Sequence, residues 1–274
     1  MTWEPSRPLT AAEQRVDWAG HLAHITDRRA ALERDVGPAV KRLALGIADL
    51  KSIPKARRGE VADRLFHALE QTARFGYTEA RREIKAMRAK HGEPTPRAVR
   101  AYAIPDIGEH SEAARKGLDG ITKLLKRRSK YSAWIIAGAI DGAAKAARAA
   151  GADEAVIIDA ALTAGSRGLH LHTLELVGET LNLGRTAGAL SFETPPKFAM
   201  RSEQLDKAMC EACGGVHGDV VELDSSEYYA LLPPAYCYGG GRCRGVMVFD
   251  DRVENVRMPE PNPETKPQPK KRAA

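Results

Sequence analysis

Thr194-Pro-Pro-Lys-Phe-Ala-Met-Arg201 divides the chain into two parts of different character. Before it, apolar residues recur at spacings of three, four and seven, which is typical of amphipathic helices. After it, short apolar pieces alternate with Gly, Pro and Asp, which is typical of short strands and turns. The sequence therefore predicts an α+β protein: a mostly α-helical N-terminal body followed by a small, cysteine-stapled β module at the C-terminus.

Caps and breakers locate the first predicted helices. Thr10-Ala-Ala-Glu13 matches a capping box and predicts a helix start. Gly37-Pro38 is expected to end that helix and to start a second one. Pro54 opens a longer helix, with Gly76 as a weak point, and the prolines of the segment 91–96 end it.

A second group of helices is expected beyond an irregular connection at 97–110. Ser111 is a candidate N-cap for a helix reaching residue 150, in which Gly138 and Gly142 indicate close packing or a bend. A turn at 151–153 precedes two further helices. They are expected near 154–165 and 171–190, with a break at Gly165-Ser-Arg-Gly168 between them.

Three strands are predicted in the last part of the chain, at 197–201, 219–223 and 244–249. The end of the chain is rich in Pro, Lys and Glu, and we expect it to be disordered. The predicted regions are a helical region at 1–96, a second helical region at 97–193, the β module at 194–258 and the tail at 259–274.

Charge is distributed unevenly along the 274 residues. Residues 1–150 hold 29 Lys/Arg and 18 Asp/Glu, a net charge of +11, whereas the remainder holds 13 and 18, a net charge of −5. No apolar run approaches the roughly 20 residues of a membrane helix, so a spanning protein is not expected. The polar start at residues 1–8 does not resemble a signal peptide.

All four cysteines fall in the acidic part: Cys210, Cys213, Cys237 and Cys243. Four thiolates in two pairs, C-x2-C and C-x5-C, suit tetrahedral Zn²⁺, and the glycines after each pair permit tight turns around a metal. Two disulfides or unpaired core cysteines are the alternatives. Because about 55 residues of short strands bury little apolar area, we expect a structural zinc to supply part of the folding free energy.

Other readings of the cysteines are weaker. A redox C-x-x-C would be expected to open a helix of a βαβ unit, and a zinc deaminase needs an H-x-E that this sequence lacks. His217 could replace a cysteine as a ligand, but a lone histidine beside a turn is more often a surface residue. His170 and His172 would point to different faces of a helix.

Positive charge concentrates at Lys123-Leu-Leu-Lys-Arg-Arg-Ser-Lys130. We expect non-specific, salt-sensitive DNA binding by such a cluster. A solvated helix face whose long side chains cover apolar surface is the alternative. The candidate nucleic-acid-binding residues are Lys123, Lys126, Arg127, Arg128 and Lys130.

No compact catalytic motif is present: there is no G-x-S-x-G, no H-E-x-x-H and no phosphate loop. Ser166, near His170, forms only a faint protease-like pattern. We therefore expect no enzymatic activity. A free-standing zinc ribbon that binds nucleic acid is the alternative function, although its basic residues would be expected on the ribbon itself.

Four pieces of the sequence, in this order, resemble the end of the phage Mu F-like head morphogenesis proteins. They are the Asn182-Leu-Gly-Arg185 helix, the segment from Arg201 through Cys210-Glu-Ala-Cys213, the Pro-Pro pair at 233–234, and the closing Cys243-Arg244. The resemblance covers about residues 155–250. The C-x5-C spacing with three glycines differs from the Cys-x-Cys, preceded by histidine, of many members.

The resemblance implies a minor structural protein of a tailed-phage head, located in the virion and made in the host cytoplasm. It implies association with the portal protein, possible contact with capsid or scaffold protein, and a role in head morphogenesis and in DNA packaging or ejection. Contact with phage DNA would then be non-specific, and no membrane partner is implied.

Overall fold

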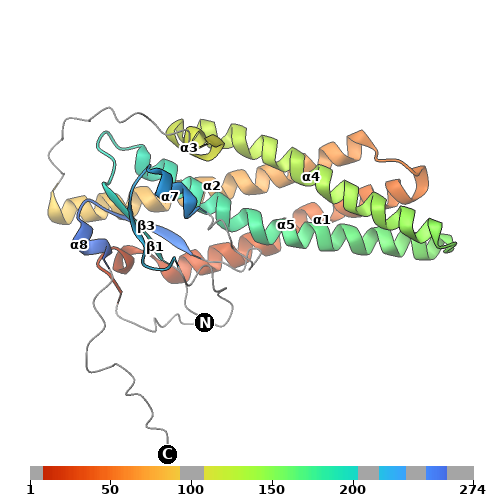
Figure 1. Cartoon of the computed structure of the whole chain (residues 1–274), viewed down its shortest axis with the longest axis horizontal. Helices are drawn as coiled ribbons and strands as arrows, with labels where there is room; N and C mark the ends of the chain where they lie inside the picture. Colours follow the sequence, from red (N-terminus) through yellow and green to blue (C-terminus); the bar gives the residue numbers. More distant parts are fainter. Residues whose placement is uncertain (1–8, 93–107, 203–215, 233–244, 258–274) are drawn as a thin grey trace, which may run out of the picture.

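The computed structural model describes residues 9–92, 108–202, 216–232 and 245–257. Four long helices run alternately up and down to form an elongated bundle, and a small sheet lies at one end of it (Figure 1). The bounds of the long helices are α1 Trp18–Leu50, α2 Lys55–His91, α4 Gly117–Ala149 and α5 Glu154–Leu190. The predicted α+β class is confirmed in this coarse form, while the cysteine staple lies outside the described residues.

Two helices are continuous at positions where the sequence predicted breaks. Pro38 lies inside α1, where its exposed ring leaves the buried stripe of Val36, Ala39 and Val40 uninterrupted. Gly165 and Gly168 lie inside α5, and an added Cβ at Gly165 would come within 2.9 Å of Val40 on α1. The predicted breaks at 37–38 and 165–168 are therefore wrong, because burial along the whole helix outweighs the low helix propensity of these residues.

Several local signals act as the sequence predicts. Pro54 precedes α2, and α2 ends at His91, inside the segment 91–96 where its end was predicted. Asp153, in the predicted turn at 151–153, caps α5 by accepting from the backbone N–H of Val156. The capping box also forms, but it opens a single 3₁₀ turn, η1 Glu13–Arg15, and α1 starts separately from Asp17.

The expected helix from Ser111 is two helices. Helix α3, Gly108–Arg115, already contains Ser111, and α4 begins at Gly117, whose φ of +65° turns the chain. Gly138 and Gly142 lie inside the continuous helix α4 and do not sit at a close contact, since an added Cβ at either position would meet nothing within 4 Å. The close packing expected at these two glycines is therefore wrong.

Three antiparallel strands, β1 Phe198–Ser202, β2 Val220–Glu222 and β3 Val246–Asp250, form a sheet in the order β2-β1-β3. They lie within one or two residues of the three predicted strands. Two short helices, α7 Ser226–Ala230 and α8 Val253–Val256, flank it.

Both faces of the sheet are covered. Met247 and Phe249 of β3 pack with Ala80 and Ile84 of α2, whereas Val246 and Val248 face the opposite cluster, which contains Val16 and Trp18. Residues from the start of the chain therefore complete the core of the C-terminal sheet. Among the described helices, none combines the length and apolar character that crossing a membrane requires.

Candidate functional site

The polar contact between α5 and β3 joins the helical body to the sheet. Asn182 donates from Nδ2 to the carbonyl oxygen of Gly245 at 2.9 Å, and its Oδ1 accepts from the N–H of Met247 at 3.0 Å. Arg185 donates from Nε to the carbonyl oxygen of Met247 at 3.1 Å. Because β3 lies at an edge of the sheet formed by the described strands, these two side chains satisfy backbone groups for which that sheet supplies no neighbouring strand.

A buried ion pair orients Arg185. Its guanidinium donates to both carboxylate oxygens of Glu83 on α2, with 3.0 Å between Nη1 and Oε1. The side chains are only 1% and 7% exposed. The pairing compensates the cost of burying either charge, so one arginine connects α2, α5 and β3.

Glycines bring α2 and α5 close enough for this pairing. An added Cβ at Gly184 would lie 2.1 Å from the carbonyl oxygen of Ala73, and one at Gly188 would lie 2.5 Å from that of Tyr77. Gly76 faces α5 in the same way, with Leu181 O at 2.3 Å. Gly76 is therefore a close-packing position and not the weak point that the sequence predicted.

Two further contacts hold the sheet region to the bundle. The Tyr228 hydroxyl lies 2.6 Å from Thr186 Oγ1 on α5, and complete burial of the ring raises the pKa of Tyr228 far above its usual range. Arg88 on α2 pairs with Asp251, at 3.2 Å, just after β3. The sequence singled out Arg185 only as part of the resemblance, and it indicated neither Glu83 nor Arg88 as a functional residue. The one available signal for Glu83 was a charged residue within the apolar stripe of Ala80, Ile84 and Met87.

The four candidate zinc ligands, Cys210, Cys213, Cys237 and Cys243, lie outside the described residues. Within the described ranges, no group of three or more His, Cys, Asp or Glu side chains is arranged to hold a metal ion. Described residues that border the two cysteine segments do lie together: Ser202, before the first, pairs in register with Val246, just after the second.

The candidate nucleic-acid-binding residues all lie on α4 but divide into two sets. Lys123, Lys126, Arg127 and Lys130 are exposed. Arg127 forms an ion pair with Glu109 of α3 at 3.2 Å, whereas no ion pair of the three lysines occurs within the described residues.

Arg128 is directed toward the bundle. It is 30% exposed and lies 3.2 Å from Glu179 of α5. His110 of α3 meets the same pair, with its Nε2 2.7 Å from Glu179 Oε1 and 2.8 Å from Arg128 Nη2. This contact holds α3 against α4 and α5, so Arg128 differs in surroundings from the other four candidates.

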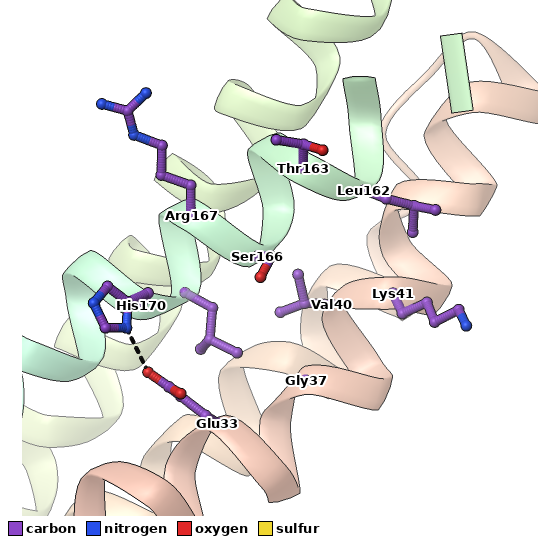
Figure 2. A pocket seen from close by; sticks show the side chains of 10 residues that line it. Glu33, Gly37, Val40, Lys41, Leu162, Thr163, Ser166, Arg167 and His170 are labelled. Atoms are coloured by element: carbon purple, nitrogen blue, oxygen red, sulfur yellow. Dashed lines mark hydrogen bonds and ion pairs between the residues drawn. The ribbon is translucent and has the colours of Figure 1, made fainter. Parts of the chain in front are cut away.

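Ser166 and His170 line an open groove of about 750 Å³ between α1 and α5 (Figure 2). His170 is turned toward Glu33, with Nδ1 2.6 Å from Oε1, while the Ser166 hydroxyl points into the groove one helical turn away (Figure 2). A serine nucleophile and its base would share a hydrogen bond. No hydrogen bond joins Ser166 and His170, both of which are described, and His170 contacts Glu33 instead.

A scan against protein-family models and searches of curated proteins and of solved structures each found no match.

Proposed function

We propose that the chain is a minor structural protein of a tailed-phage head that associates with the portal protein and acts in head morphogenesis. The support is the resemblance of residues 155–250 to the Mu F-like proteins, combined with one contact. Asn182 and Arg185, from one piece of the resemblance, bind the backbone of Gly245 and Met247, which lie one and three residues after the closing Cys243-Arg244.

This contact favours treating the separate pieces as one unit. The paired residues lie between 62 and 65 positions apart in the chain, so their order alone did not require them to meet. A helix that binds the sheet edge through a buried arginine is a rigid platform, which suits a protein whose role is to be held in an assembly.

A structural zinc held by Cys210, Cys213, Cys237 and Cys243 is part of the proposal. The pairing of Ser202 with Val246 supports it, because it places the borders of both cysteine segments at one end of the sheet. The test is the zinc content of the full chain purified without added metal: about one equivalent is expected, with loss in Cys210→Ser. Stoichiometric disulfide in a metal-free chain would contradict this part.

Phage DNA is the proposed non-specific partner, contacted by the exposed cations of α4. The alternative function is a zinc ribbon that binds nucleic acid, in which case binding would depend on the cysteines. The experiment for the main proposal has two parts: quantification of this chain in purified virions, and co-expression of the chain with the portal protein of the same phage. A few copies per particle and a stable complex with the portal are expected. Absence from particles together with failure to bind the portal would refute the proposal.

A further inference from the structure

We propose that the exposed face of α4 is a binding site for single-stranded nucleic acid, in which bases stack on Tyr131 and Trp134 and Lys123, Lys126 and Lys130 contact the phosphates. This inference deepens, and rests on, the proposed contact with DNA. It assigns a preference for unpaired strands and a role to two aromatic residues outside the candidate set.

The aromatic pair is exposed in a way that is unusual for such large rings. Tyr131 is 61% exposed and Trp134 is 56% exposed, although most large apolar side chains of this bundle are buried. The ring centroids lie 6.2 Å apart with 22° between the planes. Neighbouring π-faces on a surface can stack with bases of any sequence.

Free positive charge continues the same face toward the start of α4. Lys123, Lys126 and Lys130 follow the spacing of three and four residues that places side chains on one side of a helix, and Trp134 is the next position in the series. All three lysines are exposed, and none has an ion pair within the described residues. From residue 123 to residue 134 the helix rises about 16 Å, enough for a few nucleotides of an extended strand.

Acidic residues of α3 form ion pairs with neighbouring cations of this surface other than the three lysines. Glu112 pairs with Lys116, and Glu109 pairs with Arg127. These two acids and the lysines border a hollow of about 300 Å³ between α3 and α4. The three lysines are therefore the cations left for a ligand on this stretch of the described surface.

Nucleic acid fits this face better than a membrane or an acidic protein. A helix that binds a bilayer inserts a broad apolar face, but the apolar face of α4, with Ile121, Leu125 and Ile136, is buried in the bundle. Protein interfaces are depleted in lysine, whereas here three lysines accompany two aromatics. Duplex DNA would leave the rings unused, because its bases are already stacked.

The test is fluorescence anisotropy of the full chain with labelled dT12 and with a 12-base-pair duplex. Tighter binding of dT12 is expected, with a slope of log K against log salt of about −2 for three lysines. Trp134→Ala should weaken dT12 binding about tenfold, since that is the scale of one base stack. Trp134→Phe should retain most of the affinity and abolish the quenching of tryptophan emission by dT12.

Matched controls remove the same groups elsewhere. Lys123/Lys126/Lys130→Ala should lower the affinity and flatten the salt slope, whereas Lys41/Lys55/Lys85→Ala removes three exposed lysines from α1 and α2 and should have little effect. Leu171→Ala, at another exposed apolar position, is the control for Trp134→Ala.

Equal binding of duplex and dT12, with no effect of Trp134→Ala, would overturn the stacking site while leaving the phosphate contact of the proposed function intact. If the two triple lysine variants lost the same affinity for dT12, the assignment of the binding site to this face of α4 would be overturned. Binding to vesicles containing anionic lipid without binding to dT12 would assign the face to a membrane and overturn the inference. Absence of binding to either oligonucleotide would overturn both the inference and the DNA contact, but not the portal association.

Discussion

Arg185 and Glu83 form a bidentate ion pair between α5 and α2, and both side chains are almost completely buried. The same guanidinium donates to Met247 O on β3 and lies 5.8 Å from the centre of the Phe249 ring. The pair therefore sits where the helical body and the sheet share one core. It is the contact on which we expect the stability of this end of the molecule to depend most strongly.

Replacing Glu83 with Gln should destabilise the protein by about 3 kcal/mol, because removing one partner leaves a buried charge without compensation. Urea unfolding followed by circular dichroism measures this free energy. Glu70→Gln is the matched control, because it removes a partner of Arg74 in an ion pair whose arginine is 60% exposed. The control should cost less than about 1 kcal/mol. Equal losses in the two variants would contradict the role assigned to Glu83.

Asn182→Leu should expose the edge of the sheet. The change removes the partner of the Met247 N–H and of the Gly245 carbonyl, and each buried group left unpaired costs about 1–3 kcal/mol. In the variant, the hydrogen-exchange rate of the Met247 amide should rise much more than the rates of amides in the middle of α5. Unchanged protection of the Met247 amide in the variant would show that Asn182 does not hold this edge.

The sequence predicted the parts of this architecture that depend on local chemistry. Pro54 and Asp153 act at helix starts because each acts on the backbone groups of its own turn: Pro54 lacks an N–H, and Asp153 accepts from the backbone N–H of Val156. The change at Thr194-Pro-Pro196 also separates the four long helices from the three described strands, as expected. Here the relevant interactions span only a few residues.

The remainder depends on contacts between distant residues. Gly165 does not break α5, because the absence of a side chain there lets Val40 of α1 pack closely against the helix. The local sequence around Gly165 does not indicate that Val40 lies next to it. Glu83 and Arg185 are 102 positions apart, so an acidic residue within an apolar stripe was the only local sign of their pairing. The exposed rings of Tyr131 and Trp134 could not be foreseen either, since large aromatic residues on a helix are usually assigned to a core.

Gly184→Ala and Gly138→Ala should have opposite effects on stability. At Gly184 a methyl group would meet the backbone of Ala73 at 2.1 Å, so α2 and α5 must move apart at a cost of about 1–3 kcal/mol. At Gly138 there is open space, and alanine should stabilise α4 by about 0.5–1 kcal/mol through its higher helix propensity. Thermal or urea unfolding of the two variants tests this. Stabilisation by Gly184→Ala would refute the close crossing of the two helices.

His24 should make the protein sensitive to mild acid. Its ring stacks on Phe75 with centroids 3.6 Å apart, and burial, aided by Arg28, lowers the pKa of His24 to about 4. The unfolded chain takes up a proton near pH 6.5, so between pH 6.5 and about 4 it binds more protons than the folded protein. This contribution to stability is complete above pH 6.5 and is lost as the pH falls toward 4. Solvent screening reduces this contribution of His24, because the ring is only half-buried.

The measurement is the free energy of unfolding of wild type and His24→Phe at several pH values from 7.5 to 4. Phenylalanine keeps a ring against Phe75 but cannot be protonated, so the variant should lose less stability than the wild type over this range. His91→Gln, at an exposed position in the last turn of α2, should instead follow the wild-type curve. Parallel curves for wild type and His24→Phe would show that the folded protein accepts a charged imidazole beside Phe75, and the burial assigned to His24 would then be wrong.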